Sequence, residues 1–338
     1  MASEKKTKIA YLFGAGATHA ELLALNPELV RETQGLLISD VSSRVIQKAR
    51  GDSKYVSDLE TVSGTSGSLI EKTSGTSGSL NIELLISLIE NSKIHDWASK
   101  TARLKRWVEQ DIKHILTQTR LRRFYLHGAL LRLHVHEVVR EKEEVVGFIS
   151  LNYDDVLDRA YTEYYGKPNY CFTLNETMPS TNVPLLKLHG SFNWSDARMR
   201  GRPRTIEIIP LGSIKSYIHA PYASIWNRAL EVLVNCDRLR VIGCSLSPND
   251  VHLIDLLFKA HLERQEPFDI DVIASANAGE AIRENYGFFP KINTLVEIEN
   301  MISERDPPNP FQLWLKYKSD KMLGPARVRR LKYLRNVV

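Results

Sequence analysis

The sequence contains few cysteines, and this scarcity argues against two common structural cross-links. Cys171, Cys236 and Cys244 are the three cysteines among 338 residues, and no two of them have CxxC spacing. An odd number of cysteines without paired spacing is untypical of a disulfide scaffold and of a four-cysteine zinc site. We therefore expect a protein without zinc that works in a reducing cytoplasm.

The sequence also lacks a long apolar run. No stretch approaches the roughly eighteen consecutive apolar residues that a membrane helix needs. Residues 1–8 lead into a short apolar run and do not resemble a secretion signal. With 43% hydrophobic and 25% charged residues, the composition is that of a folded globular protein, which excludes collagen-like and mostly disordered classes. We expect no membrane partner.

A strong net charge is missing as well, but the charge is unevenly distributed. The formal charge of +5 is too small to indicate a nucleic acid or an acidic surface as partner. Basic residues gather in segments 100–123, 198–204 and 321–338, and the remainder is acidic. The first segment includes Trp107, so contact with nucleic acid is one possibility. The last segment has a basic amphipathic pattern and is either a docking helix or a solvated helix face.

Short apolar runs alternate with helical patterns along most of the chain. Buried strands are predicted at residues 9–13, 145–151, 183–188, 206–209, 239–243 and 270–274, and helices at 19–25, 153–165, 217–235 and 250–264. This alternation predicts an α/β fold, a Rossmann-like doubly wound parallel sheet covered on both faces. Ligands of such sheets bind beyond the carboxyl ends of the strands.

A long helical section interrupts the alternation after the first β-α unit. Residues 27–144 are read as an inserted helical module, with helices expected at 81–90 and 123–140. Its Ser-Gly-Thr-Ser-Gly-Ser-Leu segment occurs twice between residues 63 and 80, which indicates a flexible surface loop, because a solenoid needs at least three repeats. The predicted organisation is one α/β domain over residues 1–300 and a basic helical tail over 301–338.

Two loops after predicted strands carry glycine and small polar groups. The first contains Gly14, Ala15, Gly16 and Thr18. It lacks Cβ atoms where a pyrophosphate would approach and then leads into a helix N-terminus with free N–H groups. It is also compatible with a plain tight turn, because the full GxGxxG spacing is not met. The loop after residue 242 contains Gly243 and Ser245, whose hydroxyl can contact ribose or phosphate.

Two further loops carry side chains suited to chemistry. Asn152 and Asp154 follow one strand, either as ligand-binding groups or as caps of the next helix. His189 follows another strand and is followed by a glycine; a lone histidine in such a place is more often structural. Asp250 is expected to cap the helix after the fourth loop. All four loops should line one crevice, because they leave the same edge of one sheet.

The motifs Gly-Ala-Gly-Ala, Leu-Asn-Tyr-Asp, Leu-His-Gly and Gly-Cys-Ser-Leu, in this order, resemble the motif series of the sirtuin family in its bacterial sirtuin-like branch. The resemblance spans residues 9 to about 275. It implies NAD as the substrate. It assigns catalysis to Asn152 and His189 and assigns NAD binding to Gly14, Ala15, Gly16, Thr18, Asp154, Gly243 and Ser245.

The implied chemistry suits these side chains. Cleavage of the nicotinamide-ribose bond passes through an oxocarbenium-like state. Asn152 can hydrogen-bond a ribose hydroxyl or the attacking water. His189 can accept a proton from a ribose hydroxyl or from that water near neutral pH.

Departures from the family pattern narrow the expected activity. Deacylating sirtuins carry a zinc module with paired CxxC motifs after the His-Gly loop, whereas this chain has the basic segment 198–204 there. Its first loop runs through His19 into a helix and lacks the deacylase continuation Gly-Ile-Pro-Asp-Phe-Arg. The chain is therefore more similar to the sirtuin-like NAD hydrolases (NAD+ glycohydrolases) of anti-phage defence, which deplete NAD, than to deacylases or ADP-ribosyl transferases.

The size of the chain resembles that of the stand-alone sirtuin-like subunit that pairs with a HerA-type ATPase. That resemblance implies a homo-oligomer, a HerA-type ATPase partner and nucleic acid reached through the complex. Two alternatives stay open. One is a non-catalytic scaffold that senses NAD or ADP-ribose, and the other is a DNA-binding subunit of a defence complex.

Overall fold

The computed structural model describes most of the α/β region and part of the helical section. The described residues are 5–25, 35–52, 55, 81–92, 96–119, 124, 126–136, 143–173, 183–194, 221–247, 250–264, 269–274, 282, 284–287, 289 and 292–294. The predicted strand at 206–209, the repeated segment at 63–80, the basic segment 198–204 and the tail at 301–338 lie outside these residues.

Six strands form one parallel sheet. They are β1 (Thr7–Phe13), β2 (Glu143–Ser150), β3 (Leu185–Lys187), β4 (Arg238–Ile242), β5 (Asp269–Ile273) and β6 (Ile292–Thr294). Their lateral order is β3-β2-β1-β4-β5-β6, and every neighbouring pair is parallel. This is the strand order of dinucleotide-binding Rossmann folds, with the switch point between β1 and β4. The predicted fold class is confirmed.

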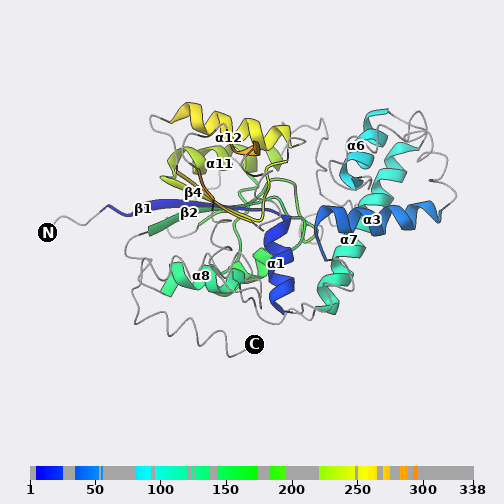
Figure 1. The fold of residues 1–338 in the computed structure, drawn as a ribbon, viewed down its shortest axis with the longest axis horizontal. Helices are drawn as coiled ribbons and strands as arrows, with labels where there is room; N and C mark the ends of the chain where they lie inside the picture. Colours follow the sequence, from blue (N-terminus) through cyan, green and yellow to red (C-terminus); the bar gives the residue numbers. More distant parts are fainter. Residues whose placement is uncertain are drawn as a thin grey trace.

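Helices cover both faces of the sheet. The described helices are α1 (Ala15–Leu25), α3 (Ile38–Arg50), α6 (Ile82–Ser92), α7 (Trp97–Gln118), α8 (Leu126–His136), α10 (Val156–Tyr165), α11 (Tyr222–Asn235) and α12 (Val251–Glu263). Figure 1 shows α11 and α12 above the sheet and α8 below it. No helix among the described ranges is long and apolar enough to cross a membrane.

The central strand β1 shows why the fold buries its apolar runs completely. Successive side chains of a strand point to opposite faces of the sheet. Accordingly, Ala10 and Leu12 belong to the core under α11 and α12, whereas Ile9, Tyr11 and Phe13 belong to the core under α8 and α10. Because both faces are covered, the strand appears in the sequence as a continuous apolar run.

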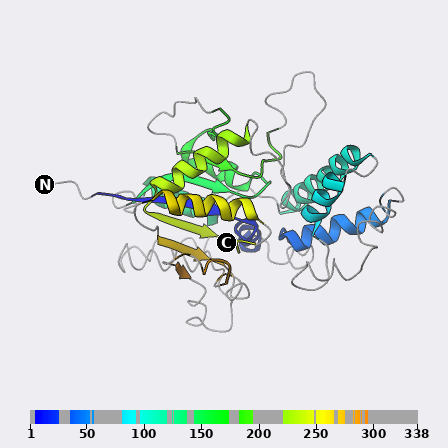
Figure 2. The same ribbon diagram turned by 90° about the horizontal axis from the view of Figure 1, so that it is seen from above.

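Helices α3, α6 and α7 pack together beside the sheet and form a helical module with its own core (Figures 1 and 2). On α6 the predicted apolar face is confirmed, since Ile82, Leu85, Ile86 and Ile89 are all buried. Helix α8 lies within the expected insertion at residues 27–144 but packs against α10 and the sheet instead. The structured part of this section therefore contributes both to the module and to the sheet's covering layer.

The carboxyl ends of five strands lie in one row. Phe13 is the register partner of both Ser150 and Ile242, Ser150 pairs with Lys187, and Ile242 pairs with Ile273. The loops that follow β1, β2, β3 and β4 therefore begin at the same edge, as the sequence predicts.

Candidate active site

Three glycines join the first and fourth loops at the switch point. A Cβ atom on Gly14 would lie 2.5 Å from the carbonyl oxygen of Gly243, and one on Gly16 would lie 2.9 Å from the Gly243 Cα. Gly243 itself has a φ of +63°, and a Cβ there would lie 2.1 Å from the Ala17 nitrogen. Glycine is required at all three positions because the two backbones touch.

The backbone donors of the first loop are largely used inside the protein. The Gly14 N–H donates to Ile242 O at 3.0 Å, the Gly16 N–H to Gly243 O at 2.9 Å and the Ala17 N–H to Gly14 O at 3.0 Å. The expectation of a helix start with free N–H groups is therefore wrong for these three donors. The donors of Gly14 and Gly16 are used in the contact with Ile242 and Gly243 at the end of β4, whereas the Ala17 N–H is used within the first loop. Ala15 lies between them and is partly exposed. Contact of this loop with NAD stays a prediction.

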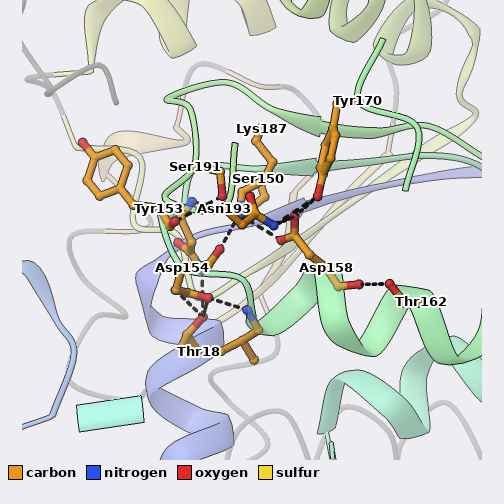
Figure 3. A network of polar contacts seen from close by, with 12 residues as sticks. Thr18, Ser150, Tyr153, Asp154, Asp158, Thr162, Tyr170, Lys187, Ser191 and Asn193 are labelled. Carbon is orange, nitrogen blue, oxygen red and sulfur yellow. Dashed lines mark hydrogen bonds and ion pairs between the residues drawn. The ribbon is translucent and has the colours of Figure 1, made fainter. Parts of the chain in front are cut away.

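Asn152, Thr18 and Asp154 form a buried network beside this contact. The Asn152 Nδ2 donates to Gly14 O and to Thr18 Oγ1, both at 3.0 Å. The Thr18 hydroxyl donates in turn to Oδ2 of Asp154 at 3.1 Å (Figure 3). Both amide hydrogens of Asn152 are thus used, so the atom left to meet a ligand is Oδ1, which accepts hydrogen bonds.

Asp154 has the capping role that the sequence left open. Its Oδ1 accepts the Val156 N–H at 3.0 Å at the start of α10. Burial raises the pKa of Asp154, while the nearby Lys187 opposes that rise. Lys187 is itself buried, donates to the Asp154 carbonyl oxygen and pairs with Asp158 at 2.9 Å (Figure 3). This lysine fixes the second loop to the end of β3, and no sequence motif marks it.

His189 lies on the loop after β3 and is 3% exposed. Its Nε2 is 3.4 Å from Oδ2 of Asp250, and the Oδ1 of Asp250 accepts the Leu253 N–H at 3.2 Å. The expected cap of α12 is confirmed, and the same carboxylate lies against the histidine. Burial lowers the pKa of His189; Asp250 opposes this effect and His252 adds to it. The imidazole is therefore neutral at pH 7, as a proton acceptor must be.

Glu83 is a site residue that sequence reasoning missed. It belongs to α6 of the helical module, is 6% exposed, and accepts the Tyr153 O–H on Oε1 at 2.5 Å. Burial raises the pKa of Glu83 to about 7; the Tyr153 hydrogen bond opposes this shift and the charge of Asp250 adds to it. The only sequence signal was an acidic side chain in the first turn of a helix with one apolar face.

The Ser245 side chain of the fourth loop lies apart from this network, and its contact with ribose or phosphate stays a prediction. Ser245 is exposed, and its carbonyl oxygen accepts the Asn285 Nδ2 at 2.9 Å. The Ser245 side chain has none of the contacts that join Asn152, Thr18 and Asp154. The next residue, Leu246, is buried with a φ of 52°, a left-handed conformation that a non-glycine residue seldom adopts. Such strain is common in binding loops.

The three cysteines are free thiols, all buried. Burial raises the pKa of Cys244 to about 11, so its thiol is protonated and a poor nucleophile. Within the described part of the chain, no group of three or more His, Cys, Asp or Glu side chains is arranged to hold a metal ion.

The aromatic residue of the basic segment 100–123 is not available for base stacking. Trp107 is 8% exposed, with Lys48 and Arg103 each 5.1 Å from its ring centroid. Neighbouring basic side chains form ion pairs within the module, including Lys105 with Glu90 at 2.9 Å. Because Trp107 is a core residue, its ring is not exposed for stacking, and contact of this segment with nucleic acid stays a prediction.

No family model and no curated protein matches this chain. Similar solved structures include a Sir2 enzyme described for its mechanism and regulation, at 13% identity over 97% of this chain and 94% of that one, with a TM-score of 0.36. A Sir2 bound to an acetylated peptide matches at 11% identity over 95% of each chain, with a TM-score of 0.39. Identities and TM-scores this low describe a distant likeness.

Proposed function

We propose that the protein is an NAD hydrolase that cleaves the nicotinamide-ribose bond and releases ADP-ribose and nicotinamide. One observation carries the proposal. At the switch point of a Rossmann-type sheet, Asn152 is oriented by Gly14 and Thr18, on the same sheet edge as the neutral His189 held against Asp250. Ligands of this fold bind at that point.

The residues suit the reaction. The nicotinamide nitrogen of NAD is cationic, so it leaves with the electron pair of the broken bond and becomes neutral without protonation. The protein must therefore hold the ribose, admit a water molecule and accept a proton. The Oδ1 of Asn152 can accept a hydrogen bond from a ribose hydroxyl or from that water. The lowered pKa of His189 keeps its ring neutral and able to accept a proton.

The motif resemblance extends the proposal to its setting. We place the activity in the cytoplasm, in anti-phage defence by NAD depletion, with a homo-oligomer and a HerA-type ATPase as partners. An enzyme that destroys NAD must be inactive until it is triggered, and assembly is a direct way to control it.

Release of nicotinamide from NAD tests the proposal. Purified protein, alone and with a HerA-type ATPase, should release nicotinamide, measured by liquid chromatography. Asn152→Ala and His189→Ala should each abolish release while retaining the circular dichroism of the wild type. His114→Ala is the matched control, because His114 is an exposed histidine on α7, outside the crevice. Full turnover in both site variants would refute the assignment.

A binding function is the second candidate, and one observation favours it. The amide hydrogens of Asn152 and the carboxylate oxygens of Asp154 are already engaged within the protein. A sensing scaffold would bind NAD or ADP-ribose, measured by calorimetry, without turnover in any assembly. The same chromatography assay separates the two candidates.

A further inference from the structure

Two buried polar atoms near the candidate site have no hydrogen-bond partner among the described residues. They are the Oε2 of Glu83 and the Nε2 of His189; the histidine nitrogen makes no hydrogen bond but lies 3.4 Å from Oδ2 of Asp250. Both side chains are more than nine-tenths buried. Buried polar atoms are nearly always paired, so an unpaired acceptor beside the candidate site can take a hydrogen bond from a bound molecule.

Glu83 lies on α6 of the helical module, outside the sheet, and contacts the loop after β2 through Tyr153. Its Oε1 is held by the Tyr153 hydroxyl, and Tyr153 directly follows Asn152. The Tyr153 ring lies 6.4 Å from the His189 ring and 5.8 Å from the Phe192 ring, measured between centroids. Tyr153 and Phe192 also belong to the module core, so the module supports both loops that carry the predicted catalytic residues.

We infer that Glu83 is a further catalytic residue, whose Oε2 takes up the proton of the attacking water. The inference rests on the proposed NAD hydrolysis. In that step the water oxygen forms a bond to the ribose C1′, and the bond from C1′ to the nicotinamide nitrogen breaks, with its electron pair passing to nicotinamide. The proton released from the water passes to the carboxylate. His189 is then left to act on a ribose hydroxyl.

The electrostatics of Glu83 suit this role. Its pKa of about 7 lies where a carboxylate is partly ionised at neutral pH and still basic enough to take a proton. The groups whose charge or hydrogen bonding acts on it are Tyr153, on the loop after β2, and Asp250, at the start of α12. The pKa of Glu83 is about 7, whereas burial lowers the pKa of His189 below 6.5. A pH profile therefore distinguishes the two groups.

The test is the pH dependence of kcat for nicotinamide release by the full-length protein in the assembly that is active. A base must be deprotonated, so activity should fall on the acid side with a midpoint near pH 7 for the wild type. Glu83→Gln keeps an oxygen for the Tyr153 hydroxyl and removes the base. Its kcat should fall about 100-fold or more, and its remaining activity should no longer fall near pH 7.

Tyr153→Phe provides a second readout. It keeps the ring and removes the hydrogen bond that lowers the Glu83 pKa, so the acid limb should move to higher pH. Glu90→Gln is the matched control on the same helix, about 10 Å further along its axis. It disrupts the pairing with Lys105 and should leave the pH midpoint where it is in the wild type.

Two outcomes would overturn the inference while the proposed function stands. One is a Glu83→Gln variant with wild-type kcat; the other is a uniform loss of kcat with the acid limb unchanged, which is the sign of a purely structural role. A wild-type protein that binds NAD and releases no nicotinamide would overturn the proposed function and the inference with it.

Discussion

Replacing Asn152 by aspartate exchanges an amide nitrogen for an oxygen with almost no change in shape. In the wild type, Nδ2 donates to Gly14 O and Thr18 Oγ1, each at 3.0 Å. In the variant, an oxygen that cannot donate faces the Gly14 carbonyl. The ionised carboxylate is also placed beside the buried Asp154, which the Thr18 hydroxyl joins to the same network. The substitution therefore removes two hydrogen bonds and adds a buried charge.

The expected cost is large. Each lost hydrogen bond contributes about 1 kcal/mol, and a buried charge without a partner costs about 3–5 kcal/mol. Because the group can relieve part of this by taking up a proton, we expect Asn152→Asp to lower the free energy of unfolding by about 3–5 kcal/mol at pH 7.5. Urea denaturation followed by circular dichroism measures it.

The pH dependence of this loss has a definite sign. The introduced carboxyl should have a pKa above that of the unfolded chain, because only its protonated form can donate to Gly14 O. The folded state then binds more protons, so the destabilisation should be greatest at neutral pH and shrink as the pH falls toward the unfolded pKa of about 4. Comparison with wild type at each pH isolates this effect.

A matched substitution controls for the change of residue type. Asn235 is an exposed asparagine at the end of α11, whose Nδ2 donates to Glu231 O at 2.8 Å. Asn235→Asp should cost less than about 1 kcal/mol, mainly through the helix dipole. If Asn152→Asp were no more destabilising than Asn235→Asp, the amide orientation and the argument that Oδ1 faces the ligand would both be wrong.

Three further predictions concern the scaffold around the site. Gly243→Ala should prevent folding or lower the unfolding free energy by more than about 3 kcal/mol, because its Cβ meets backbone; Gly166→Ala, with a φ of +78° and open space, should cost about 1–3 kcal/mol in the same urea assay. Lys187→Met should cost about 3–5 kcal/mol by leaving Asp158 buried without its cation, and a wild-type urea midpoint would contradict this. Burial lowers the pKa of His134 from 6.5 to about 4, so the unfolded chain binds its proton first and wild-type stability should fall between those pH values. His134→Gln should flatten that fall, and an unchanged slope would count against a lowered pKa of the buried His134.

The sequence predicted the elements whose cause is local. Strands β1, β2, β4 and β5 each contain a buried apolar stretch, because a parallel sheet covered on both faces buries most side chains of its strands. Helix α6 shows the 3.6-residue periodicity of a helix with one buried face. Strand β6 has only three residues, Ile292–Thr294, which are too few to show a pattern.

The position of the polar loops was also predictable from the sequence, but the contacts that their residues make within the protein were not. The order of glycines and polar side chains after strands predicted one shared edge, and the register of the strand ends confirms it. Gly14 and Gly16 make room for Gly243 in the structure, a contact that the sequence did not predict, and their contact with a phosphate stays a prediction. The chain separates the two loops by more than 200 residues, so no local pattern records that contact.

What the sequence determined by itself is therefore the α/β class, the position of most described strands and the four polar loops at one edge of the sheet. Only the tertiary structure decided which atoms in those loops are still available. It directed Asn152 toward Gly14 and Thr18, placed Asp250 against His189 and brought Glu83 of α6 to Tyr153. The physical reason is that the apolar pattern of a strand or helix can be read along that single segment. A hydrogen bond between two loops instead depends on how segments distant in the sequence pack together.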